Sequence, residues 1–170
     1  MTLLRRIARY RVTLGFVSGA LAIWLAHPTP ATLSIGGAVA LAGEAIRVWA
    51  AGHLEKGREV TTSGPYAFTR HPLYLGSTVM GVGLGYASAN WIVAVLVVAY
   101  LLITLTAAIR TEEAHLTDKF GTAYPAYRAG TVTGVRRRFS VERAVRNREY
   151  RALVGLLLVL AIFAWKVRTS

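Results

Sequence analysis

The sequence has 170 residues, of which 54% are hydrophobic and only 16% are charged. A mean hydropathy of +0.44 is too high for an ordinary soluble domain of this size, so lipid is expected to form part of the solvent. The absence of cysteine excludes disulfides, thiolate nucleophiles and zinc–thiolate sites. The net charge of +12 would suit nucleic acid, but no DNA-reading motif accompanies it, and we expect no nucleic-acid partner.

Five apolar blocks divide the chain. They predict an all-α, multi-pass transmembrane helix bundle of about five spans, forming one integral membrane domain over residues 1–170. A helix needs about 20 residues to cross a bilayer, somewhat fewer when flanking residues snorkel, so the first and third blocks are marginal in length. The predicted spans are residues 12–26, 31–51, 73–87, 91–109 and 152–167.

The basic residues follow the positive-inside rule. Four arginines precede the first block, three basic residues lie in 52–72, and ten lie in 110–151, whereas the two short turns between blocks have none. We therefore expect a cell-membrane protein with its N-terminus and both polar segments in the cytoplasm. Lys166 and Arg168 then fall on the opposite side, against the rule. A cleaved signal peptide is the alternative for the N-terminus, although the next block follows after only a tight turn.

The first polar segment, residues 57–76, is rich in turn formers and hydroxyls. Ser63-Gly-Pro65 predicts a turn, and Pro72 suits the first position of the following helix, with His71 near its N-cap. Unpaired backbone N–H groups at a helix start can hold an anion such as the carboxylate of an amino acid. The alternative is that His71 serves only as a cap.

The second polar segment, residues 108–128, begins where the fourth predicted span ends. An apolar stripe at helical spacing predicts an amphipathic or re-entrant helix that holds Glu112 and Glu113 near the cytoplasmic side. Adjacent helix residues diverge by about 100°, so only one of these carboxylates should point at a given ligand. The alternative is that both simply pair with nearby arginines. The stripe residues are Leu116, Phe120, Tyr124 and Tyr127.

Three further features have both a functional and a structural interpretation. Glu44 and Arg47 lie at i and i+3 inside the second predicted span, where an ion pair is either functional or a support for the fold. The three glycines within 81–85 imitate a nucleotide-binding motif, but no strand precedes them, and close helix packing is the better interpretation. The arginines of 136–138 are expected to contact anionic lipid headgroups.

Several motifs occur in a fixed order along the chain. Val60-Thr-Thr-Ser-Gly-Pro-Tyr66 is followed by Arg70-His-Pro-Leu-Tyr-Leu-Gly76, a hairpin of two spans, Glu112-Glu113 and then Phe120-Gly121. This order resembles the isoprenylcysteine carboxyl methyltransferase and phospholipid methyltransferase family of membrane enzymes. The resemblance covers about residues 44–135, and the ordered set is far more specific than any one motif.

The resemblance implies an S-adenosylmethionine-dependent methyltransferase. Its cofactor site would lie at the cytoplasmic ends of the later spans, and its acceptor would be lipophilic, either a prenylcysteine-like carboxylate or a phospholipid amine. The expected partners are this lipophilic substrate and membrane lipids, the oligomeric state is left open, and no metal is expected. The catalytic candidates are Glu112 and Arg110. The implied cofactor-binding residues are Val60, Thr61, Thr62, Tyr66, His71, Pro72, Tyr74, Gly76 and Glu113.

The sequence departs from the prenylcysteine enzymes at Ala108, where they carry an arginine that contacts substrate. Arg110 is near but on a different helix face. A carboxylate acceptor would need only a cationic anchor such as Arg110, whereas an amine would need a base, for which Glu112 and His115 are the candidates. Two other classes stay open, an NADPH-dependent membrane reductase related to sterol reductases and a non-enzymatic lipid-binding membrane protein.

Overall fold

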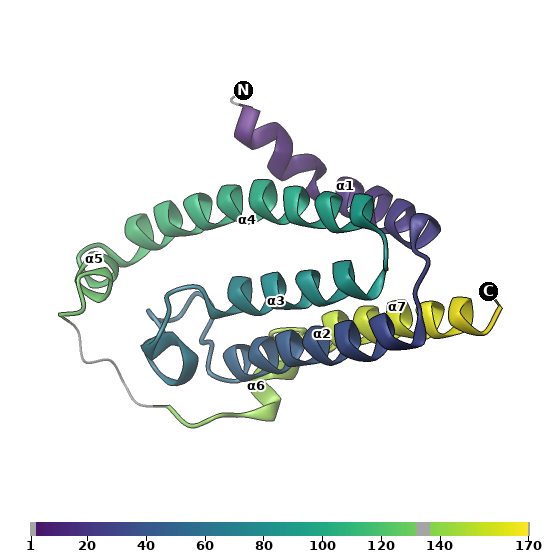
Figure 1. Ribbon diagram of the computed structural model, residues 1–170. Helices are drawn as coiled ribbons and strands as arrows, with labels where there is room; N and C mark the ends of the chain where they lie inside the picture. Colours follow the sequence, from purple (N-terminus) through teal and green to yellow (C-terminus); the bar gives the residue numbers. More distant parts are fainter. Residues whose placement is uncertain (1–2, 132–136, 170) are drawn as a thin grey trace.

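The protein is described by a computed structural model that covers residues 3–131 and 137–169, with side chains described for Thr13 and from residue 15 onward. Every regular element within these residues is a helix, which confirms the all-α prediction (Figure 1). The elements are α1 (Leu3–Leu25), α2 (Pro30–Ala51), the 3₁₀ helix η1 (Gly64–Ala67), α3 (Pro72–Ala87), α4 (Trp91–Phe120), α5 (Ala123–Arg128), α6 (Val141–Arg146) and α7 (Tyr150–Thr169).

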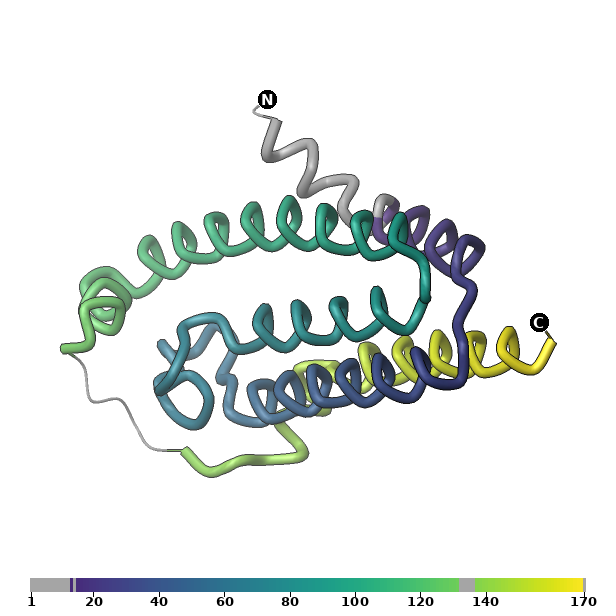
Figure 2. Tube along the Cα trace, in the orientation of Figure 1, coloured from purple at the N-terminus to yellow at the C-terminus, as the bar shows by residue number. Residues whose placement is uncertain are grey.

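Three helices, α2, α4 and α7, are long and apolar enough to cross a bilayer. They run roughly alongside one another in Figure 2, with α3 next to α2. The helix α3 has only 16 residues, and the apolar part of α1 is confined to Gly15–Leu25. A membrane helix bundle is thus supported by three helices, while five complete spans remain a prediction.

The helix α4 extends well past the predicted end of the fourth span. It continues without a break from residue 109 to Phe120 and ends at Gly121, whose positive φ of 54° closes the helix. The intervening residues include no glycine or proline, so nothing in them stops a helix. The predicted separate amphipathic or re-entrant helix is therefore replaced by the end of α4 and the short helix α5.

Glycines allow α2 and α3 to pack backbone against backbone. A Cβ atom added at Gly43 would lie 2.4 Å from the Met80 nitrogen, and one added at Gly83 would lie 2.4 Å from the Ala40 nitrogen. Small residues permit this close approach between membrane helices. Gly81, in turn, faces α4, and the packing interpretation of the glycines in α3 is supported. Gly36 and Gly76 complete the contact between α2 and α3.

The two short turns lie together at one end of the bundle, where polar side chains satisfy helix ends. The Asn90 amide nitrogen donates to the Leu25 carbonyl at 2.8 Å. The Lys166 ammonium donates to the carbonyls of Ile23 and Trp24 at 2.9 and 3.2 Å. Lys166, which fitted the charge rule poorly, thus caps the last turn of α1.

Candidate functional site

A cavity of about 630 Å³ lies at the end of the bundle opposite the two short turns. Its walls come from the 52–71 loop between α2 and α3, the start of α3, the end of α4 and α5 (Figure 1). The volume falls within the roughly 300–1,000 Å³ of small-molecule pockets. The two polar segments thus meet around one cavity. Its aromatic lining is Tyr66, Tyr74, Phe120, Tyr124 and Tyr127.

Glu113 joins three parts of the cavity wall through one carboxylate oxygen. Its Oε1 accepts from the Arg70 guanidinium at 3.2 Å and from the Tyr124 hydroxyl at 3.2 Å. The His71 Nε2 lies 3.1 Å from the same oxygen. Since Arg70 and His71 precede α3 and Tyr124 belongs to α5, this carboxylate fixes both segments to the end of α4.

Glu112, the neighbouring residue, faces the cavity itself. Its Oε2 accepts from the Tyr74 hydroxyl at 2.6 Å, and it lines the cavity whereas Glu113 does not. The divergence of adjacent helix positions explains this division, which agrees with the expectation that only one carboxylate points at a ligand. The hydroxyl of Tyr74 is thereby held beside an exposed carboxylate.

The start of α3 has the predicted arrangement. His71 is the N-cap residue and Pro72 the first residue of the helix, but the His71 side chain makes no capping bond. Its ring instead stacks on that of Tyr74, with 5.7 Å between the centroids and 27° between the planes, and reaches Glu113. The local sequence thus determines where the α3 backbone begins. Because the His71 ring does not cap the helix, it is free to line the cavity.

The cavity-lining tyrosines Tyr66, Tyr124 and Tyr127 keep their phenolic protons at neutral pH. Burial, reinforced by the nearby carboxylate, raises the pKa of Tyr124 to about 12, and burial also raises the pKa of Tyr66 and of Tyr127. The Tyr127 hydroxyl donates to the Tyr66 carbonyl at 2.6 Å. Protonated phenols cannot serve as general bases, so Glu112 and His115 are left as the cavity-lining candidates for that role.

The structure separates the predicted site residues into two groups. Four of them, Arg110, Thr62, Gly76 and Glu113, do not line the cavity. Arg110 is exposed and lies two residues before Glu112, which is about 200° around the helix. Gly76 packs against α2, where an added Cβ would lie 2.7 Å from the Gly43 carbonyl oxygen. The predicted residues that line the cavity are Val60, Thr61, Tyr66, His71, Pro72, Tyr74 and Glu112.

Arg47 also lines the cavity, and its four partners come from α2, from α3 and from the residue before α7. Its Nε lies 2.7 Å from Glu149 and 3.4 Å from Glu44, so the predicted pair of Glu44 and Arg47 is present. Its Nη1 donates to the Ser77 hydroxyl and, at 3.4 Å, to the Leu73 carbonyl. Glu149 lies 102 residues from Arg47, and no local signal in the sequence indicates this partner.

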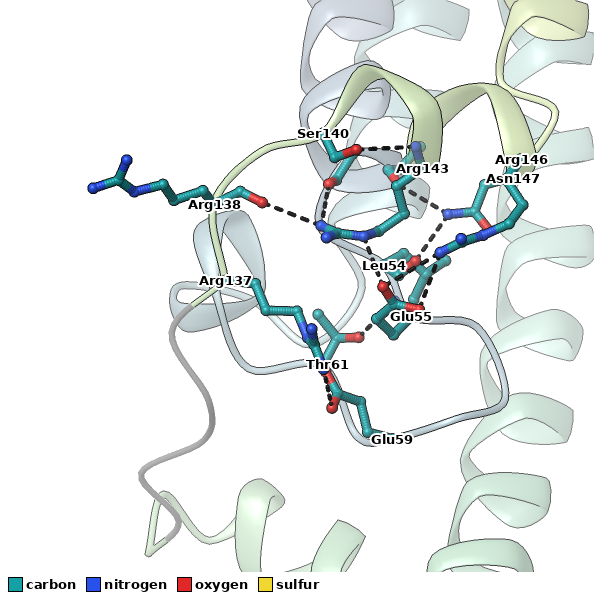
Figure 3. Close-up of polar contacts among 12 residues, drawn as sticks. Leu54, Glu55, Glu59, Thr61, Arg137, Arg138, Ser140, Arg143, Arg146 and Asn147 are labelled. Atoms are coloured by element: carbon teal, nitrogen blue, oxygen red, sulfur yellow. Dashed lines mark hydrogen bonds and ion pairs between the residues drawn. The ribbon is translucent and has the colours of Figure 1, made fainter.

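The segment 137–149, here named the strap, includes α6 and binds the first half of the 52–71 loop (Figure 3). Glu55 forms ion pairs with Arg143 at 2.8 Å and with Arg146 at 3.1 Å. The side chains of Glu55 and Arg143 are only 10% and 14% exposed, so water screens their interaction weakly. No motif in the sequence indicates this cluster, in which one acid is shared by two arginines.

The strap also satisfies carbonyl groups at the end of α2. The Arg143 guanidinium donates to the Gly52 carbonyl at 2.7 Å. The Asn147 side chain donates to the carbonyls of Ala51 and Leu54, both at 2.9 Å (Figure 3). The last carbonyls of a helix have no hydrogen-bond partner within the helix. These bonds therefore hold the strap at one defined position against the end of α2. The cavity wall formed by the loop is thereby held from outside.

Arg137 corrects part of the prediction that residues 136–138 contact lipid headgroups. Its Nε and Nη2 bind the two carboxylate oxygens of Glu59 at 2.7 and 2.9 Å. This two-point contact is typical of arginine and carboxylate, and it makes Arg137 part of the strap's attachment to the loop. Residue 136 lies outside the described residues.

The Arg137 contact leads to a prediction for acid conditions. The hydrogen bond from Arg137 lowers the pKa of Glu59 below its ordinary value of 4.5. A group with a lowered folded-state pKa stabilises the fold above its unfolded pKa, and this contribution is lost as the pH falls through the folded pKa. Glu59→Gln should therefore reduce the loss of stability as the pH falls below about 5, measured by thermal unfolding in detergent.

The matched control is Glu142→Gln, which changes an exposed acid in α6. Equal pH profiles for both variants would contradict the assignment of this acid sensitivity to the contact between Arg137 and Glu59.

Fold and site together define a helical membrane protein with a small-molecule cavity at one end of its bundle. The phospholipid methyltransferase family model matches residues 10–123, about two thirds of the chain. The chain belongs to this family, which confirms the resemblance seen in its motifs. The matched region contains the 52–71 loop and the glutamates of α4, and it ends before the strap.

Three characterised proteins are similar to the chain. It is 31% identical over 98 residues to protein-S-isoprenylcysteine O-methyltransferase of Schizosaccharomyces pombe, covering 58% of this chain and 42% of that protein. It is 35% identical over 127 residues to the cobalt-zinc-cadmium resistance protein CzcN of Cupriavidus metallidurans, covering 68% and 56%. With the nickel-cobalt-cadmium resistance protein NccN of Alcaligenes xylosoxydans xylosoxydans the identity is 34% over 76 residues, covering 44% and 36%.

The chain thus spans between about a third and somewhat over half of the length of these relatives. No solved structure shows a significant match to it. Two of the relatives are named for metal resistance, which directs attention to metal ligands. Within the part of the chain that the structure describes, no group of three or more histidine, aspartate or glutamate side chains is placed to hold a metal ion.

Proposed function

We propose that this protein transfers a methyl group from S-adenosylmethionine to a lipophilic acceptor at the cytoplasmic face of the cell membrane. The observation that carries the proposal is the joining of the 70–74 motif to Glu112 and Glu113 around one cavity at the end of a helix bundle. Membership of the phospholipid methyltransferase family supports the reaction class.

The residues around the cavity fit S-adenosylmethionine, which when bound supplies an electrophilic methyl group on a sulfonium. Five aromatic side chains offer apolar faces for a purine. Glu112 presents a carboxylate whose described partner is the uncharged Tyr74 hydroxyl, so its negative charge is available to a cationic ligand. The side chains of His71 and Tyr74 would orient the donor, with Glu113 holding His71 in place.

The position of the cavity suits a reaction between a water-soluble donor and a lipid. The cavity lies where the apolar part of α4 gives way to its polar end, and Ala107, Ala108 and Thr104 form the wall toward the apolar part. Holding two reactants in line and excluding water is the main requirement for methyl transfer. The acceptor would be a prenylcysteine-like carboxylate or a phospholipid amine; the amine would need Glu112 or His115 as base.

The proposal is tested by calorimetry with S-adenosylhomocysteine on the full chain in detergent. We expect binding by the parent and weaker binding by His71→Ala, because the ring lines the cavity. His27→Ala is the matched control, since His27 is exposed and lies in the turn at the opposite end. A parent that binds NADPH but not S-adenosylhomocysteine would instead support a reductase, and indifference to both would leave a lipid-binding protein.

A second assay identifies the acceptor. Membrane lipid extract is incubated with the protein and a donor labelled on its methyl group, and the labelled product is analysed by chromatography and mass spectrometry. We expect label in a lipid-soluble product from the parent and much less from Glu112→Gln if the acceptor is an amine. A carboxylate acceptor needs no base, so with the donor at saturating concentration the Glu112→Gln rate should stay closer to that of the parent.

A further inference from the structure

Most charged side chains that line the cavity are neutralised within the protein. Glu55 and Glu59 bind arginines of the strap, Arg47 binds Glu149 and Glu44, and Arg70 binds Glu113. Two cations remain without an ion pair among the described residues. These are Lys56, in the loop, and Lys119, in the last turn of α4.

The strap explains why Lys56 has no carboxylate partner. Glu55 and Glu59 are its neighbours in the sequence and would be its nearest acids. Both are occupied, Glu55 by Arg143 and Arg146 and Glu59 by Arg137 (Figure 3). Each occupied carboxylate already accepts bonds from guanidinium groups, which bind carboxylates in a fixed two-point geometry that an ammonium does not match. Lys56 therefore lines the cavity without an ion pair to either neighbouring acid, and its side chain is exposed to solvent.

Lys119 approaches the same part of the wall from α4. Its Nζ lies 3.4 Å from the position that a Cβ on Gly57 would take, so the ammonium reaches the residue directly after Lys56. It also lies 5.9 Å from the centroid of the Phe120 ring. Glu112, which forms no ion pair within the described residues, lies two turns or about 10 Å away along the helix, and its carboxylate accepts from the Tyr74 hydroxyl. Lys56 and Lys119 thus line the same part of the cavity wall, and neither forms an ion pair in the part of the chain that the structure describes.

We propose that Lys56 and Lys119 form a subsite for an anionic oxygen group, a carboxylate or a phosphate, of a ligand in the cavity. An anion that reached both ammonium groups would gain two charge-assisted hydrogen bonds. The subsite rests on the proposed function for the identity of its ligand. The anion is either the amino-acid carboxylate of the donor or the anionic group of a lipid acceptor.

The first experiment asks whether the donor supplies the anion. Binding of S-adenosylhomocysteine and of 5′-methylthioadenosine, which lacks the amino-acid part, is measured with the full chain in phosphatidylcholine nanodiscs. We expect Lys56→Gln with Lys119→Gln to weaken S-adenosylhomocysteine about tenfold and to leave methylthioadenosine unchanged. The difference should shrink at 0.5 M salt, because partly exposed charges are screened. Arg58→Gln is the matched control, an exposed cation of the same loop that does not line the cavity.

The second experiment asks whether an acceptor supplies the anion. Binding of a fluorescent fatty acid and of its methyl ester is measured in the same nanodiscs, and the double variant should lose the preference for the acid that the parent shows. Loss in either experiment supports the subsite and identifies its ligand. Unchanged binding of both anions by the double variant, relative to Arg58→Gln, would overturn it. A parent that binds the fatty acid but not S-adenosylhomocysteine would refute the proposed donor while the subsite stands; binding of neither anion refutes the subsite.

Discussion

Replacing Gly43 with alanine is expected to destabilise the protein by about 2–3 kcal/mol. The added methyl group would lie 2.4 Å from the Met80 nitrogen and 2.7 Å from the Gly76 carbonyl oxygen. Both are backbone atoms of α3 and cannot rotate away, so α2 and α3 must separate. In a helix interior the same change is otherwise favourable by roughly 1 kcal/mol, so its sign depends on the tertiary contact. Unfolding in a denaturing detergent, followed by circular dichroism, measures the effect.

Gly155→Ala is the matched control for this prediction. Gly155 lies in α7, and a Cβ added there would meet nothing within 4 Å. Its stability should be unchanged or raised by up to about 1 kcal/mol. Equal stability of the Gly43→Ala and Gly155→Ala proteins would show that α2 and α3 do not pack as closely as described.

Replacing Glu113 with alanine is expected to weaken S-adenosylhomocysteine binding about a hundredfold, if the proposed function is right. The change removes the acceptor shared by Arg70, His71 and Tyr124 and leaves their donors without this partner. Lost bonds to a charged group cost about 1.5–3 kcal/mol each when partly buried, and about 2.7 kcal/mol corresponds to a hundredfold change in affinity. The His71 ring would then no longer be fixed to α4. Calorimetry in detergent measures the loss.

Two further variants separate this positioning role from general damage. Asp118→Ala changes an exposed acid on the same helix that does not line the cavity, and it should bind like the parent. Glu113→Gln keeps an acceptor oxygen and should recover part of the affinity. Thermal unfolding of each variant controls for loss of structure. Full affinity in a folded Glu113→Ala protein would mean that the joined segments do not position the ligand.

The helix positions were largely predictable from the sequence. Apolar blocks bounded by proline and polar turns placed α2, α3 and α7 to within about two residues of their observed ends. The fourth predicted span ends at 109, whereas the helix α4 continues to Phe120. Hydropathy reports where a helix leaves the apolar region, whereas the helix itself ends only where its backbone is interrupted, here at Gly121.

The meeting of the two site segments was also predictable, because short turns force neighbouring helices to run antiparallel and bring their polar ends together. The direction in which each side chain points was harder to predict from the sequence. Arg110 and Glu112 are two positions apart, and only helix rotation in the bundle decides that Glu112 lines the cavity and Arg110 does not. Gly76 belongs to the family motif in the sequence but serves the contact between α2 and α3 in the fold.

The membrane character, the helical class and the family can be read from the sequence, because they depend on composition, periodicity and ordered motifs within short stretches. Which charges are neutralised depends on the folded arrangement of the chain. Glu149 pairs with Arg47 across 102 residues, and Arg137 pairs with Glu59 across 78. Residues so far apart in the sequence form ion pairs only because the fold brings their side chains together. The proposed role of Lys56 depends on these ion pairs, because they occupy the acids next to it in the sequence.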